Sequence, residues 1–186
     1  MVNYSGGDAR GLTAQVEVRS LDGALSWEKT TSLDCPEDST ISCIKMEYPA
    51  GLTPVQFLLL KLTRGEEILS SNFYWRGSKE GDYRALRELP KVKLAAATRV
   101  EQRGSTWHLT TELHNVSKHP ALMVRVKAVR EKSGDRILPA FFSDNYIALM
   151  PGDRRTIRIE LENSDTRGEK PRVVVEGFNT QEVKEE

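Results

Sequence analysis

Apolar and polar residues alternate with a period of two through most of this chain, whereas helical periodicity is almost absent. In the segment "LTAQVEV", Leu12, Ala14, Val16 and Val18 point to one side and polar residues point to the other. The segments "STWHLTTEL", "MVRVKAV" and "RTIRIELE" repeat this pattern. Each predicts a strand with one buried face, and the residues predicted to face inward are Trp107, Leu109, Thr111, Leu113, Val124, Val126, Ala128, Ile157, Ile159 and Leu161.

A hairpin is predicted in the first half of the chain. The segment "VQFLLLKL" is apolar on both faces, which is typical of a central strand covered on both sides. The turn "TRGEE" leads from it into "ILSSNFYW", where Leu69, Phe73 and Trp75 are predicted to reach a core.

The alternation stops between Arg76 and Lys91. Here Tyr83, Leu86 and Leu89 have a helix-like spacing that ends at Pro90, which predicts a linker with a short helical turn. About six strands are predicted before this linker and about seven after it. Short strands in such numbers, separated by frequent turns, predict two antiparallel β-sandwiches in tandem. The expected division is residues 1–76, with a first strand cut short at the chain start, a linker at 77–90, and residues 91–186 ending in a disordered tail.

Composition excludes some classes of partner. Lys plus Arg and Asp plus Glu both total 27, so the formal net charge is zero and nucleic acid is not an expected partner. The run "FLLL" is far shorter than the roughly 20 apolar residues of a membrane-spanning helix, so no membrane partner is expected either. No signal-peptide pattern stands at the start, which looks instead like a cut into an existing strand.

The cysteines and histidines do not predict a metal site. Cys35 and Cys43 form either a bridge across a small loop or two free thiols. Small secreted folds have many disulfides, whereas this chain has one pair of cysteines, so free thiols are favoured. A metal site would need more ligands than this pair provides. His108 and His114 share an outward strand face but lie about 20 Å apart at roughly 3.3 Å per residue, too far for one ion. His119 follows in a loop, and all three are interpreted as surface histidines.

Catalytic motifs are weak throughout the chain. Glycosidases need two facing carboxylates, yet acidic residues fall mostly on outward strand positions, as Glu112, Glu160 and Glu162 do. The pattern "GxSxG" is absent, and the glycine-rich "SGGDARG" lacks the lysine of a phosphate loop. "NYS" and "NVS" fit the glycosylation sequon. No catalytic residue and no cofactor is therefore predicted.

The aromatic residues leave two interpretations open. Trp27, Trp75 and Trp107 occupy positions compatible with a core. The aromatics near bends serve either packing or a ligand platform, with packing favoured: Tyr83, Phe141, Phe142 and Tyr146. The stretch "SDNY" that contains Tyr146 stands between two predicted strands, and it suits either an active-site loop or a structural bend.

Four stretches of the chain carry a family resemblance. They are "SSNFYWRGSKEGDYRALRELPKVKL", "GSTWHLTTELHNVSKHPALMVRVKAV", "ILPAFFSDNYIALMPGDRRTIRIELE" and "PRVVVEGFN". Together they resemble the C-terminal β-sandwich region of glycoside hydrolase family 2 enzymes, in the branch of exo-β-D-glucosaminidases, β-mannosidases and plant endo-β-mannosidases. The resemblance covers nearly the whole chain and is most specific at Asn72 to Trp75 and Ser143 to Gly152. Asp153 stands where the family often has glutamate, and Phe178 where it often has tryptophan.

The resemblance implies an all-β fold of two tandem immunoglobulin-like antiparallel β-sandwiches. These would be non-catalytic accessory domains of an exported glycosidase, periplasmic or secreted, packed beside the (β/α)₈ barrel that holds the catalytic glutamates. A barrel needs at least about 200 residues, so it cannot lie in this chain. The implied partners are that barrel, in the same parent chain, and the oligosaccharide or polysaccharide substrate of the parent enzyme.

The same resemblance favours the structural interpretation of "SDNY". Asp144 and Asn145 would then bond backbone groups in an unusual conformation, and Tyr146, Ile147 and Leu149 would return to the core. A stand-alone carbohydrate-binding module and a protein-interaction module stay as alternatives, because a sandwich fold alone does not assign a function.

Overall fold

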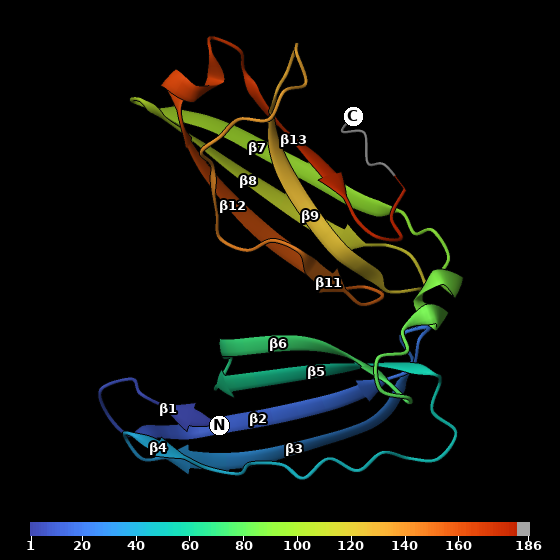
Figure 1. Ribbon diagram of the computed structural model, residues 1–186. Coiled ribbons are helices and arrows are strands. Elements are labelled where there is room, and N and C mark those ends of the chain that lie inside the picture. Colours follow the sequence, from blue (N-terminus) through green and yellow to red (C-terminus); the bar gives the residue numbers. More distant parts are fainter. Residues whose placement is uncertain (182–186) are drawn as a thin grey trace. The chain divides into compact units, whose positions relative to one another are not determined.

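The computed structural model describes residues 1–181, within which thirteen strands and two short 3₁₀ helices are found, and no α-helix (Figure 1). Six strands precede residue 78 and seven follow residue 93, as the sequence predicts. All pairings between these strands are antiparallel. The tail predicted to be disordered lies outside the described residues.

Contacts divide the chain into two compact units, residues 1–88 and the residues from 89 onward. The division falls inside the predicted linker. The first 3₁₀ helix, η1 (Arg84–Glu88), lies immediately before it and buries Leu86. A short helical turn is therefore present where the spacing of Tyr83, Leu86 and Leu89 predicts one.

The first unit is built on a four-stranded sheet in the order β3-β2-β5-β6. Its strands are β2 (Ala9–Arg19), β3 (Leu25–Cys35), β5 (Val55–Arg64) and β6 (Glu67–Gly77). A second sheet consists only of β1 (Val2–Asn3) and β4 (Ser39–Thr40). This unit is thus a sandwich in which one sheet is reduced to two short strands.

Burial in the first unit follows the predicted pattern, with one exception. Leu12, Val16 and Val18 are buried on β2, and the first four residues of β5 are all buried, as expected for an inner strand. The prediction for Leu69 is wrong, because this side chain is 38% exposed. Leu62 pairs with Ser70 and the next residue of β5 pairs with Ile68, which leaves Leu69 as the extra residue of a bulge on an edge strand.

The second unit is a sandwich of a four-stranded and a three-stranded sheet, in the orders β10-β12-β8-β7 and β11-β9-β13. Its strands are β7 (Leu94–Arg103), β8 (Thr106–Asn115), β9 (Ala121–Arg130), β10 (Phe141–Phe142), β11 (Ile147–Leu149), β12 (Arg154–Glu162) and β13 (Pro171–Glu176), with η2 (Asn163–Thr166) after β12. The residues predicted to face inward on β8, β9 and β12 are at most 2% exposed, except Trp107, which is half-buried. Period-two alternation therefore placed this core correctly.

The two units share one scheme of strand pairing, which the sequence pattern does not predict. In the first unit β1 pairs with β4, and β2 pairs with β3 and β5. In the second, β8 pairs with β12, and β9 pairs with β11 and β13. The strands follow one another in the same order along the chain in both units, so the first unit adds β6, and the second unit adds β7 and β10, to a shared plan.

Candidate functional site

The "SDNY" stretch connects the two sheets of the second unit. Ser143 exchanges backbone and side-chain hydrogen bonds with Arg158 of β12: its N–H donates to the Arg158 carbonyl, and its Oγ accepts from the Arg158 N–H, both at 2.9 Å. Asn145 bonds to β9 instead, where its Oδ1 accepts from Val126 N–H at 2.9 Å and its Nδ2 donates to the Val126 carbonyl at 3.1 Å. The side chain of Asn145 thus imitates a paired strand residue.

These bonds support the structural interpretation of the bend. Asp144, the one carboxylate in it, is exposed and accepts a hydrogen bond from the N–H of Asn145 at 2.8 Å. Ile147 and Leu149 return to the core as predicted, at 8% and 0% exposure. Tyr146 does not: it is 56% exposed, so that prediction is wrong. The unusual backbone also belongs to Tyr146, with φ 56°, and not to the Asp or Asn before it.

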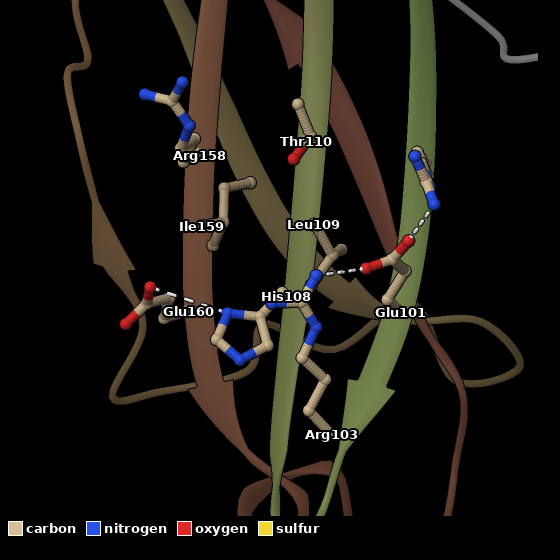
Figure 2. A pocket seen from close by; sticks show the side chains of 9 residues that line it. Glu101, Arg103, His108, Leu109, Thr110, Arg158, Ile159 and Glu160 are labelled. Atoms are coloured by element: carbon tan, nitrogen blue, oxygen red, sulfur yellow. Dashed lines mark hydrogen bonds and ion pairs between the residues drawn. The ribbon is translucent and has the colours of Figure 1, made fainter.

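A groove of about 360 Å³ lies on the outer face of β7, β8 and β12 (Figure 2). Its side chains are mostly charged or polar and alternate with the core-facing residues of the same strands: Arg99, Glu101, Arg103, His108, Thr110, Arg158 and Glu160. Three arginines against two glutamates give this groove a small positive excess.

The two carboxylates of the groove differ in their surroundings. The Arg103 guanidinium donates a hydrogen bond to Glu101 at 2.8 Å, and together with the charge of Arg99 it holds the pKa of Glu101 below its usual value. A general acid needs the opposite shift, so that its proton is still bound near neutral pH. The side chain of Glu160 is 62% exposed, and its Oε1 lies 3.5 Å from His108 Nδ1. Glu112 and Glu162 are exposed, as predicted.

The histidines and cysteines stay apart. His108 and His114 occupy one outward strand face, in register with Glu160 and Arg154 of β12 respectively. Within residues 1–181, no three side chains of His, Cys, Asp or Glu are grouped so that they could hold a metal ion. Cys35 is buried, Cys43 is half-buried, and both are free thiols.

Both asparagines of the N-x-S patterns are buried and bonded. Asn115 Nδ2 donates to the carbonyls of His119 (2.8 Å) and Leu149 (2.9 Å), and its Oδ1 accepts from the N–H of Ser117 at 3.0 Å. Asn3 makes a similar set: its Nδ2 donates to three carbonyls, those of residues 7, 35 and 36, and its Oδ1 accepts from the N–H of residue 5. With 0% and 4% exposure, these amides fix bends at equivalent places in the two units and are not accessible to glycosylation.

The aromatics near bends divide between packing and exposure. Phe142 packs on the core of the second unit, and the Tyr83 ring meets Trp75 edge-on at 6.4 Å between centroids. Phe141 is 71% exposed. Trp27, Trp75 and Trp107 are half-buried. No planar row of exposed tryptophans is therefore present among the described residues.

Comparison with known proteins identifies the family. The sequence profile described as Exo-beta-D-glucosaminidase Ig-fold domain matches residues 72–180, more than half of the chain. The chain belongs to this family. The match runs from the middle of β6 through the second unit, and it includes the "SDNY" bend.

Similar proteins are larger glycosidases. The chain is 28% identical to the exo-beta-D-glucosaminidase of Streptomyces avermitilis, across 98% of this chain and 23% of that protein. It is 25% identical to the mannosylglycoprotein endo-beta-mannosidase of Lilium longiflorum, across 98% of this chain and 26% of that protein. The chain spans about a quarter of the length of these relatives.

A solved structure shares the fold of nearly the entire chain. The exo-chitosanase CsxA of Amycolatopsis orientalis aligns with a TM-score of 0.89 and 25% identity, covering 98% of this chain and 24% of that one. The predicted all-β fold of tandem immunoglobulin-like sandwiches is thereby confirmed. No helix of residues 1–181 has the length and apolar character to cross a membrane.

Proposed function

We propose that this chain forms the non-catalytic accessory domains of a glycoside hydrolase that cleaves β-linked glucosamine or mannose residues. The catalytic domain would lie in the same parent chain, and the two units described here would pack against it and support it. The parent enzyme, and not this chain, would bind and hydrolyse the oligosaccharide or polysaccharide.

The observation that carries this proposal is the share of the relatives that the chain covers. Glycosidases align with 98% of this chain, yet with only about a quarter of their own length. The carboxylates described above agree with an accessory role, because Glu101 is ion-paired and Asp144 only supports its own bend. The alternative of a stand-alone carbohydrate-binding module is less well supported, because the three tryptophans are half-buried and do not form an exposed surface on which a sugar ring could stack.

Two experiments test the proposal. The coding sequence upstream should encode a (β/α)₈ barrel, and its absence would refute the proposed parent. The purified chain should release no product from aryl β-glucosaminide, β-mannoside or β-galactoside, measured by absorbance over hours, and should show no calorimetric binding of the free sugars. Turnover that disappears in Asp144→Asn would contradict the accessory role and make "SDNY" a catalytic loop.

A further inference from the structure

The outer face of the sheet β11-β9-β13 carries three exposed apolar side chains that lie close along the backbone. Met123 is 41% exposed, Tyr146 is 56% exposed and Phe178 is 47% exposed. The two strands run antiparallel with Ile147 opposite Val124, so Tyr146 lies beside Arg125, two residues along β9 from Met123. The N–H of Phe178 donates to the carbonyl preceding Met123 at 2.9 Å. We call these three residues, with Arg125 and Glu176 between them, the β9 patch.

The backbone is strained at two members of the β9 patch. Met123 and Tyr146 have φ values of 52° and 56°, the left-handed region that glycine and asparagine adopt far more readily. Met123 also belongs to a bulge, since Ile147 pairs with Val124 while Leu149 pairs with Ala121, which leaves Leu122 and Met123 together opposite Ala148. A bulge locally bends the strand and changes how its side chains are presented.

These three side chains do not belong to the core of the second unit. The core is complete without them, because the neighbours of Met123 on β9, Leu122 and Val124, are 0% and 1% exposed. A glycine at position 123 or an asparagine at 146 would relieve the strained backbone and remove apolar surface from water. Strained residues and clustered exposed apolar side chains both mark interaction surfaces.

The charges inside the β9 patch are already paired. Arg125 forms an ion pair with Glu176 and donates a hydrogen bond to Tyr146 Oη at 3.2 Å. Lys127 Nζ lies 2.7 Å from the second oxygen of Glu176. Two cations around one carboxylate leave one positive charge in excess. A partner that covered the patch would therefore be mainly apolar and would bring a carboxylate to its rim.

We propose that the β9 patch docks against the catalytic domain of the parent chain, an inference that rests on the proposed function. About three-quarters of the length of the relatives lies outside the region that this chain matches. A parent protein of that length would hold a large domain covalently attached to this chain. Tyr146 and Phe178 also belong to "SDNY" and "EGFN", two stretches that resemble the family, yet neither side chain is buried in the core. An interface in the whole protein gives both of them a role.

Methionine oxidation tests the interface directly. The complete parent protein and the isolated 186-residue chain are treated with dilute hydrogen peroxide, and the sulfoxide at each methionine is followed by peptide mass spectrometry. Met123 should react at least about tenfold more slowly in the parent than in the isolated chain, because docking shields its thioether. Met150, which is 3% exposed, is the internal control and should react slowly in both.

A variant separates docking from folding. Met123→Gly relieves the left-handed strain, so the isolated chain should keep or raise its thermal midpoint. In the parent, the same substitution should lower the unfolding transition of the catalytic domain, measured by scanning calorimetry. Arg172→Ala, at an exposed position of β13 outside the patch, is the matched control and should change neither transition.

The possible outcomes distinguish the two proposals. Equal reactivity of Met123 in the parent and in the isolated chain would overturn the docking surface and leave the accessory function standing. Protection of Met123 in the isolated chain that grows with protein concentration would assign the patch to self-association, which also overturns it. A coding sequence without a catalytic barrel would overturn the accessory function and this inference with it.

Discussion

Asn115 offers a sharp test of how the second unit is held together. Replacing it with alanine removes two hydrogen bonds to the carbonyls of His119 and Leu149 and one from the N–H of Ser117, at a site with 0% exposure. Each buried group left unsatisfied costs about 1–3 kcal/mol, and partial relaxation brings the expected total to about 3–5 kcal/mol. Because a domain of this size is stable by only about 5–15 kcal/mol, the loss is a large share of its stability.

The free energy of unfolding of Asn115→Ala can be measured from native-state amide exchange of β8 and β12 peptides in urea. These peptides report on the second unit without interference from the first. Glu112→Ala, an exposed change on the same strand, is the control and should stay within about 0.5 kcal/mol of the unchanged protein. A loss below about 1 kcal/mol for Asn115→Ala would show that water or neighbouring groups replace its bonds, and the reasoning would fail.

Three further changes test other features. The ammonium of Lys127, and after it the guanidinium of Arg125, lower the pKa of Glu176. The ionised Glu176 therefore stabilises the fold fully above the ordinary glutamate pKa of about 4.3, and this stabilisation is lost as pH falls through the lowered pKa. The difference in thermal midpoint between the unchanged protein and Glu176→Gln should therefore shrink as the pH is lowered through this range. Arg130 is buried and donates to the carbonyls of Asp165 and Thr166 in η2 and of Arg136, so Arg130→Met should cost about 2–4 kcal/mol in urea unfolding, and a neutral result would contradict this account. A Cβ at Gly77 would meet two backbone oxygens at 2.6 and 2.7 Å, so Gly77→Ala should lower the stability of the first unit by about 1–3 kcal/mol, and an unchanged exchange rate in β5 would argue against the clash.

The fold could be predicted from the sequence where one physical rule dominates. Burial of one strand face produces period-two alternation, and this located Val124, Val126, Ile157 and Ile159 in the core. The rule fails at Leu69, because a bulge inserts one residue and reverses the facing of the residues beyond it. Nothing in "ILSSNFYW" signals that insertion, since bulges depend on the partner strand as well.

The sequence predicts a bend at "SDNY", and the structure has one, but the sequence does not identify the residue with the unusual backbone conformation. Asn145 and Asp144 were expected to carry the unusual backbone, because their short polar side chains tolerate it best. In the structure the side chain of Asn145 makes two hydrogen bonds to the backbone of Val126, and the residue with the left-handed backbone conformation is Tyr146. Such a shift depends on contacts between distant parts of the chain, which local propensity does not contain.

Tandem domains with one pairing scheme face a hazard during synthesis, because a strand of the domain made first can insert into its counterpart. Here two pairs of corresponding strands differ in length: β3 has eleven residues and β11 has three, whereas β5 has ten and β13 has six. An exchange of β11 for β3 would leave most of the β3-facing edge of β2 without partners. Unequal strand length therefore disfavours swapped assembly of these two units, even though their plan is shared.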